Sequence, residues 1–584
     1  MLDATDMNHA GLVQDWLDEF EAALAGGPEA LRGLFLEDCH WRDVLAGDWQ
    51  IRTFSGVSAV TTALAACLAE TRPAAFAQPS DRVAAGPVSR AGEDVLEAIF
   101  IFTSARGSCE GVLRLKPAAD GTMKAWTLLT ALNQISGHEE PLNETRPTGA
   151  SNARDFRGPN WLDQRRDSAA FADRNPNVLV VGCGQAGLAI AARLVQLGVD
   201  TLVVDRHERI GDNWRKRYHA LTLHNKTQAN HLPYMPFPPN WPAYIPKDKL
   251  ANWFEAYAEA MELNVWTETA FEGGTYDDAA GRWNATVVKN GYSRLLKPRH
   301  VVMATGVSGI PFCPDMVGLD VFKGPVLHAS EYTDGEDWRG KRAIVFGTGN
   351  SGHDIAQDLW SAGARVTMVQ RRPTLVVQVE PSAQLPYALY WSGLPLEDCD
   401  LITISMPLPL QRRTHQLLTE DARRQDKPLL DRLEAAGFRL DFGEDDTGWQ
   451  MKYLTRGGGY YFNVGCSDLI ADGSIALVQN DDVRGFTPDG IRLNDGRTVD
   501  ADLVVLATGY HGQDVLIRRL FGDVVADRVG PIWGFGDEQE LRNMFVRTRQ
   551  QGLWFIAGSL AQCRIYSKYL ALQIKACELG LMAP

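Results

Sequence analysis

Two glycine-rich turns, each between a short apolar stretch and a helical stretch, constrain the fold of this chain more than any other feature. The pattern Gly-x-Gly-x-x-Gly occurs at residues 182–187 and again at 347–352. In a strand–turn–helix unit, such glycines permit a tight turn, close approach of the backbone to a phosphate, and close packing of helix on strand. The sequence therefore predicts two Rossmann-type α/β units that each bind a dinucleotide. The predicted phosphate-binding residues are Gly182, Gly184 and Gly187 in the first turn and Gly347, Gly349, Asn350, Ser351 and Gly352 in the second.

The residue that ends the second strand of each unit predicts which ribose the unit binds. In the first unit this residue is Asp205, which suits hydrogen bonds to an unphosphorylated ribose diol, as in FAD, with Arg206 beside it as a further candidate contact. The equivalent residue of the second unit is Gln370, and Arg371 and Arg372 follow it. Because arginine binds phosphate through charge-assisted hydrogen bonds, we expect this unit to prefer or tolerate NADP. A solvated arginine pair is the alternative, and use of both NADPH and NADH stays open.

The rest of the chain divides around these two units. Residues 1–137 begin with an amphipathic helical pattern and continue with alternating, strand-like stretches, which predicts a small α+β domain. Residues 138–175 are rich in Pro, Gly, Asn and charged residues, which is typical of a linker. We expect the first part of an FAD-binding domain at 176–328, an NAD(P)H-binding domain at 329–503, and the second part of the FAD-binding domain at 504–584.

The composition argues against several other classes of protein. The formal net charge of −15 disfavours nucleic acid as a partner, because phosphate backbones are bound by clustered Lys and Arg. The nine cysteines form no Cys-x-x-Cys pair, so we expect neither a dithiol flavin reductase nor a metal site. The sequence shows no secretory leader and no long apolar run, which predicts a cytoplasmic protein without an integral membrane segment.

The segment between the two turns carries a longer fingerprint. Residues 322–332 read F-K-G-P-V-L-H-A-S-E-Y, which matches the pattern F-x-G-x-x-x-H-x-x-x-Y/F. With its two glycine turns, the chain resembles the flavin-containing monooxygenases over roughly residues 175–584. Baeyer–Villiger monooxygenases usually have Trp at the last position, so Tyr332 favours the flavin-containing branch. The preceding α+β domain is similar to the NTF2-like extension of the type II members.

The resemblance implies FAD and NADPH as cofactors and O2 as co-substrate. One oxygen atom is then inserted into a small organic substrate through a C4a-(hydro)peroxyflavin. The type II members are associated with Baeyer–Villiger oxidation of ketones and with oxygenation of sulfur or nitrogen, so ketones, sulfides and amines are the expected substrates. Three points stay open at this stage: an NAD(P)H oxidase or flavin reductase, a non-enzymatic redox sensor that binds both dinucleotides, and assembly as a homodimer.

The resemblance also implies which residues lie near the flavin. Trp214 is in a segment similar to the family's Gly-Gly-x-Trp loop, although an acidic residue replaces the second Gly. The family's active-site Asn corresponds to Asn225 or to the neighbouring His224, and these two residues compete for a catalytic role. On the last helix, Gln562 is expected to contact the flavin and Arg564 to stabilise a peroxy anion. A turn-capping Asn225 and an ion-paired Arg564 are the structural alternatives.

Overall fold

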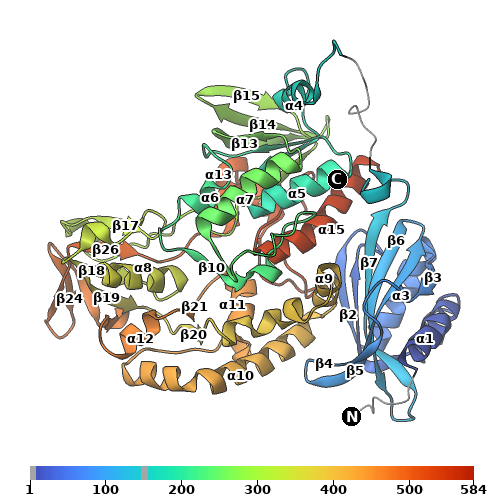
Figure 1. Ribbon diagram of the computed structural model, residues 1–584, viewed down its shortest axis with the longest axis horizontal. Helices are drawn as coiled ribbons and strands as arrows, with labels where there is room; N and C mark the ends of the chain where they lie inside the picture. Colours follow the sequence, from blue (N-terminus) through green and yellow to red (C-terminus); the bar gives the residue numbers. More distant parts are fainter. Residues whose placement is uncertain (1–7, 147–155, 584) are drawn as a thin grey trace.

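Both glycine turns lie at the carboxyl end of a buried strand in a five-stranded parallel sheet. The computed structural model describes residues 8–146 and 156–583 (Figure 1). The first sheet has the order β12-β9-β8-β16-β27 and the second has the order β17-β26-β18-β19-β22. The two predicted Rossmann-type units are therefore confirmed. Strands of the first sheet are β8 (Val178–Val181), β9 (Thr201–Val204), β12 (Val265–Trp266), β16 (His300–Met303) and β27 (Leu553–Phe555), and those of the second are β17 (Val326–His328), β18 (Arg342–Phe346), β19 (Arg365–Gln370), β22 (Ala476–Gln479) and β26 (Leu503–Leu506).

Each sheet takes strands from distant parts of the chain. β27 joins the first sheet beside β16, and the last helix, α15 (Leu560–Glu578), packs against α5 (Gln185–Gln196) of the first unit. β17 pairs with β26 in the second sheet, although sequence analysis placed 326–328 in the first unit. β26 likewise spans the boundary expected at 503. These two boundaries need correction, because composition does not show which strands exchange hydrogen bonds.

A large helical insertion separates β19 from β22 and was not predicted. Its longest member is α10 (Leu408–Ala435), which lies along the lower edge of the molecule (Figure 1). β20 (Leu375–Gln378) and β21 (Tyr460–Asn463) flank it and pair with each other in parallel. The insertion brings new side chains to the space between the two Rossmann units. Helices of this region and of the second unit are α8 (Asn350–Ser361), the 3-10 helix η6 (Ser382–Trp391), α9 (Leu396–Ile404), α11 (Gly448–Arg456) and α12 (Cys466–Ala471).

The N-terminal unit is the α+β domain that the sequence predicts. Its seven-stranded sheet has the order β2-β1-β7-β6-β5-β3, with β4 also paired to β5. The helices α1 and α3 lie on the side away from α9 and α15 (Figure 1). The open face of the sheet is therefore turned toward the rest of the chain. The elements are α1 (His9–Leu24), α2 (Pro28–Arg32), β1 (Phe35–Val44), β2 (Ile51–Ser55), α3 (Val57–Thr71), β3 (Ala74–Ala77), β4 (Gly86–Arg90), β5 (Glu93–Ser104), β6 (Gly107–Pro117) and β7 (Met123–Ile135).

The segment predicted to be a linker contains a helix, α4 (Trp161–Ala170). Asn160 and Asp163 form a reciprocal capping box at its start, in which each side chain accepts a hydrogen bond from the other's backbone N–H. Such a cap stabilises a short helix despite a polar composition. The prediction of an extended linker is therefore wrong for α4, and residues 147–155 lie outside the described part of the chain.

The remaining elements form small sheets and surface helices around the two units. Among the described helices, none combines the length and the apolar composition that crossing a membrane requires. These elements are α6 (Asp212–Arg215), β10 (Thr222–Lys226), β11 (Tyr244–Pro246), α7 (Lys247–Ala260), β13 (Thr269–Asp277), β14 (Arg282–Lys289), β15 (Tyr292–Leu296), β23 (Val483–Thr487), β24 (Gly490–Leu493), β25 (Thr498–Asp500), α13 (Gln513–Phe521) and α14 (Asp523–Val529).

Candidate active site

The first glycine turn is packed so tightly that side chains are excluded. Gly182 has a φ of 106°, and a Cβ added there would lie 2.6 Å from the carbonyl oxygen of Ala304. A Cβ added at Gly187 would lie 1.8 Å from the carbonyl oxygen of Gly182. Helix α5 starts directly after Gly184, and no side chain of the described residues caps it. Its first N–H groups are therefore free to bind an anion such as a pyrophosphate.

The second glycine turn repeats this construction. Gly347 has a φ of 115°, and a Cβ there would lie 2.2 Å from the carbonyl oxygen of Ala507. A Cβ at Gly352 would lie 2.2 Å from the carbonyl oxygen of Gly347. At the start of α8, the Asn350 Oδ1 accepts a hydrogen bond from the Phe462 N–H at 3.0 Å. Both turns thus have the shape that fits a dinucleotide, and both rest on an Ala-Thr-Gly segment.

The two units differ at the ribose end of the turn. Asp205 accepts hydrogen bonds from the N–H groups of Cys183 at 2.7 Å and His207 at 2.9 Å. Burial alone would raise the pKa of Asp205, but hydrogen bonds outweigh it and hold the pKa below its usual value. The His207 side chain, 3.0 Å away, contributes most to this lowering, and the two backbone N–H groups add to it. The carboxylate is therefore ionised and fixed at the end of β9. Arg206, next to it, is exposed.

In the second unit, Gln370 is turned inward and bonded to the backbone of Arg439, so it is not available to a ribose. Arg371 and Arg372 are exposed and lie on the wall of the central cavity. Throughout residues 8–146 and 156–583, no carboxylate pairs with either guanidinium. Unpaired arginines at this place fit a phosphorylated ribose.

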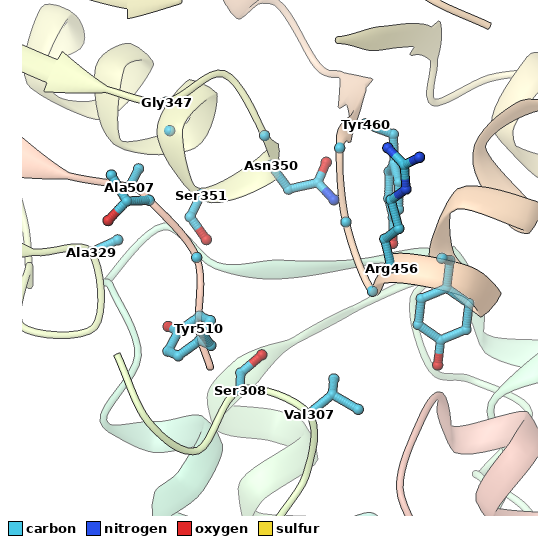
Figure 2. Close-up of a pocket in the computed structure, with 18 of the residues that line it drawn as sticks. Val307, Ser308, Ala329, Gly347, Asn350, Ser351, Arg456, Tyr460, Ala507 and Tyr510 are labelled. Carbon is cyan, nitrogen blue, oxygen red and sulfur yellow. The ribbon is translucent and has the colours of Figure 1, made fainter. Parts of the chain in front are cut away.

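A cavity of about 1750 Å³ lies between the two units (Figure 2). This volume exceeds that of a typical single-ligand pocket and has room for a nicotinamide together with a substrate. Figure 2 shows the second glycine turn on one side of the cavity and Val307 and Ser308 opposite. Among the described residues of the first turn, only Gln185 reaches this wall. Predicted site residues on the wall are Trp214, His224, Asn225, Gly347, Gly349, Asn350, Ser351, Gly352, Arg371 and Arg372.

Both candidates for the active-site Asn position are on the cavity wall, in β10. The Asn225 Nδ2 donates a hydrogen bond to the Tyr387 hydroxyl at 3.1 Å, which fixes the amide. The His224 ring packs edge-on against Phe462, with 4.4 Å between ring centroids. Burial lowers the pKa of His224 to about 4, so the imidazole is neutral near pH 7 and is a weak base. Asn225 is therefore held by a hydrogen bond, whereas His224 is held by ring packing and is uncharged.

The start of α15 reaches the cavity, but Gln562 is used to cap the helix. The Ser559 side chain accepts from the Gln562 N–H at 3.2 Å, and the Gln562 side chain accepts from the Ser559 N–H at 3.3 Å. The Gln562 Oε1 also accepts from the Tyr453 hydroxyl at 2.6 Å. Gly558, Ser559 and Leu560 line the cavity instead. The helix N-terminus, rather than the Gln562 side chain, is what α15 presents there.

Arg564 does not lie on the cavity wall. Its side chain is 3% exposed and forms a bidentate ion pair with Asp400 at 2.8 and 2.7 Å. The remaining Nη1 donates to the carbonyl oxygens of Ala229 at 2.9 Å and His231 at 2.8 Å. The expected role in stabilising a peroxy anion needs correction, because these partners already occupy the guanidinium.

Several known proteins are similar to this chain. The family model for pyridine nucleotide-disulphide oxidoreductases matches residues 179–388. The indole-3-pyruvate monooxygenase YUCCA1 of Oryza sativa subsp. japonica is 33% identical over 337 residues, which are 57% of this chain and 77% of the relative. A probable indole-3-pyruvate monooxygenase of Arabidopsis thaliana, YUCCA9, is 31% identical over 340 residues, 57% of this chain and 74% of the relative.

The chain belongs to the flavin-containing monooxygenase family. It is accordingly an oxidoreductase. The open crystal structure of cyclohexanone monooxygenase is 16% identical and has a TM-score of 0.51, covering 69% of this chain and 88% of that one. The enzyme from Rhodococcus sp. Phi1 bound to NADP+ is 15% identical, with a TM-score of 0.51 and coverage of 69% and 85%. At these identities the likeness shows a shared fold.

The fingerprint residues His328 and Tyr332 are both held by hydrogen bonds to segments beside the second sheet. The His328 Nε2 lies 3.0 Å from the carbonyl oxygen of Gly509, in the second Ala-Thr-Gly segment. The Tyr332 hydroxyl donates to Asp358 of α8 at 2.6 Å. The Tyr218 hydroxyl, which comes from the first unit, donates to Asp354 of the same helix at 2.6 Å. The two tyrosines thus bind α8 from both units, while His328 contacts the segment that follows β26.

Another side of the cavity carries a wall of aromatic side chains, most of which the sequence did not predict. The helical insertion supplies Tyr387, Trp449 and Tyr453, and a loop after α14 supplies Trp533. Tyr460, at the start of β21, completes this wall, and it is labelled in Figure 2. The aromatic side chains belong to no motif. Nothing in their spacing indicated a shared cavity.

Proposed function

We propose that this chain is an FAD-dependent NAD(P)H monooxygenase that inserts one oxygen atom from O2 into a small organic substrate. The main support is that the two glycine turns are packed in the same way, whereas the residues expected to contact the ribose differ in charge between the two units. One unit ends in the ionised Asp205, and the other ends in Arg371 and Arg372. Two dinucleotides of different type on either side of one cavity fit hydride transfer between them.

FAD is assigned to the first unit. Gly182, Gly184 and Gly187 leave room for its pyrophosphate, the free N–H groups of α5 bind that anion, and Asp205 accepts hydrogen bonds from a ribose. Trp214 donates to the Gln185 side chain at 3.3 Å and forms part of the cavity wall. When bound, the flavin supplies the chemistry that accepts hydride and activates O2.

NADPH is assigned to the second unit. The turn from Gly347 to Gly352, with Asn350 and Ser351 at the start of α8, would hold its pyrophosphate. Arg371 and Arg372 would bind the 2′-phosphate, and NADH would lack this contact. We therefore propose NADPH as the preferred donor, with NADH accepted more weakly.

This chain's own residues shape the space where substrate binds. Asn225, held by Tyr387, presents a fixed amide to the cavity. The aromatic side chains of Tyr387, Trp449 and Tyr460 reduce access of water, and the α15 N-terminus favours negative charge nearby. Orientation of a substrate there would rest on hydrogen bonds and apolar contact with this wall.

We further propose that the N-terminal unit is an NTF2-like extension of the type II kind. Its helices α1 and α3 cover one face of the seven-stranded sheet, and the other face is turned to α9 and α15 (Figure 1). With that assignment, both Baeyer–Villiger oxidation and oxygenation at sulfur or nitrogen fall within the proposal. Indole-3-pyruvate and cyclohexanone, which appear in the names of related proteins, belong in the substrate panel.

The test compares electrons consumed with oxygen transferred. NADPH oxidation, O2 uptake, hydrogen peroxide and product are measured together for the purified yellow protein, with a ketone, a sulfide, an amine and indole-3-pyruvate. A monooxygenase yields product in proportion to NADPH for at least one of these classes. Peroxide in full proportion to NADPH with every substrate would instead show an oxidase, and binding of both dinucleotides without turnover would show a redox sensor.

A further inference from the structure

The N-terminal unit docks on the rest of the chain through buried charges. Arg42, in β1, is 4% exposed and pairs with Glu540 at 2.6 Å. Arg114, in β6, is fully buried and donates to the Ser405 hydroxyl at 2.6 Å. A buried charge that loses its partner is strongly destabilising. The docked arrangement is therefore part of the native fold and not a loose association of two domains.

The same unit fixes both ends of α9. Arg82 forms an ion pair with Asp398, in the first turn of α9, and the Val83 N–H donates to the same carboxylate at 2.9 Å. At the last residue of the helix, the carbonyl oxygen of Ile404 accepts from Arg42. The position of α9 is thus set by the N-terminal sheet.

From α9, Asp400 reaches across to α15. It binds Arg564 through two hydrogen bonds of 2.8 and 2.7 Å and also accepts from the Tyr390 hydroxyl at 2.9 Å. Arg564 uses its other donors on the carbonyl oxygens of Ala229 and His231, at 2.9 and 2.8 Å. Because its side chain is 3% exposed, water does not compete for these bonds.

The turn that Arg564 binds, residues 229–231, is hydrogen-bonded to the backbone of Asn225. Asn230 is 2% exposed, and its Nδ2 donates to the carbonyl oxygens of Asn225 at 2.9 Å and Lys226 at 3.1 Å. The connection between the N-terminal unit and the cavity wall therefore consists of hydrogen bonds and ion pairs at every step. It runs from the sheet to α9, then to Arg564, and then to the turn that supports Asn225.

We propose that Arg564 is a positioning residue, through which the docked N-terminal unit holds the Asn225 strand in place. An arginine suits this role because its planar donors bind a carboxylate and two carbonyls at once, which a lysine ammonium on a flexible stem does not do in the same directions. The link itself follows from the contacts. Its consequence for the reaction rests on the proposed function, in which Asn225 faces the reacting groups.

The first test measures backbone order in the FAD-bound protein. Arg564→Lys is compared with Arg299→Lys, which weakens the ion pair with Glu578 at the far end of α15 and involves neither carbonyl. Amide hydrogen exchange in the segment 225–231 should become roughly tenfold faster in Arg564→Lys, since hydrogen bonds to a charged donor are lost, and should stay unchanged in Arg299→Lys. Unchanged exchange in Arg564→Lys, or equal acceleration in both variants, would overturn the proposal.

If Arg564→Lys does not fold, Asp400→Asn weakens the ion pair while keeping the size of the side chain. The same local acceleration at 225–231 supports the proposal, and wild-type exchange there overturns it. The second test measures peroxide per NADPH. This ratio should rise in the Arg564 or Asp400 variant but not in Arg299→Lys, with KM for NADPH unchanged. A wild-type protein that transfers no oxygen would refute the proposed function, and the exchange result would still decide the positioning link.

Discussion

Replacing the third glycine of either turn by alanine should remove one dinucleotide and spare the other. Real Cβ atoms essentially never have contacts below 3.0 Å, so the turn would have to open by at least 1.2 Å at Gly187 and by 0.8 Å at Gly352. Such overpacking costs about 1–3 kcal/mol. The shift also lengthens hydrogen bonds from the turn to a pyrophosphate, and each bond to a charged group contributes about 1.5–3 kcal/mol. Together these losses predict affinities weaker by roughly a hundredfold or more, since 1.4 kcal/mol is a factor of ten.

The assay separates the two sites by colour and by titration. Gly187→Ala should be isolated without FAD, whereas Gly352→Ala should stay yellow and lose NADP+ binding in isothermal titration. Gly33→Ala is the matched control, because a Cβ there meets nothing within 4 Å, and it should behave as wild type. A folded Gly352→Ala protein that binds NADP+ with wild-type affinity would refute the assignment of the second turn.

Three further changes test the rest of the site and the N-terminal unit. The double variant Arg371→Ala/Arg372→Ala should raise KM for NADPH roughly 10- to 100-fold and leave KM for NADH within about twofold, because charge-assisted hydrogen bonds to the 2′-phosphate are lost. An equal rise in KM for both donors would contradict the 2′-phosphate site. Asn225→Ala should keep its FAD but lose roughly a hundredfold in product formation, by analogy with removing one preorganised hydrogen-bond donor, and Tyr387→Phe should lose less; wild-type product rates in Asn225→Ala would exclude a role for this amide. Burial raises the pKa of Asp43 to about 7 from 3.8 in the unfolded chain, so the free energy of unfolding should fall as pH rises from 3.8 to about 7. Asp43→Asn should flatten this pH dependence in thermal melts, and a wild-type slope in Asp43→Asn would show that another group is responsible.

The parts of the fold that follow from the sequence are those in which a local pattern allows one physical solution. The turns at 182–187 and 347–352 can be formed only by glycine, because backbone oxygens occupy the space of a side chain. Their positions and the two Rossmann units were therefore predictable. The identity of Asp205 and of the arginines after β19 was equally local, since each residue directly follows its strand.

Other features depend on partners far along the chain. Arg564 is paired with Asp400, 164 residues away, and no spacing rule connects the two. The positive charge of Arg564 and its position on the last helix suggested a catalytic role. Only the buried ion pair shows that the guanidinium is already occupied. The aromatic wall likewise comes largely from an insertion without a motif, and β17 lies in the second sheet because it pairs with β26, a strand far along the chain.

If two dinucleotides of different type face one cavity and exchange hydride there, NADPH must reduce the bound flavin. The most direct measurement is anaerobic titration of the purified protein with NADPH while flavin absorbance is recorded. We expect stoichiometric FAD in the isolated protein and loss of its visible absorbance on addition of NADPH. A colourless protein that does not take up FAD, or a bound flavin that NADPH fails to reduce, would contradict this expectation.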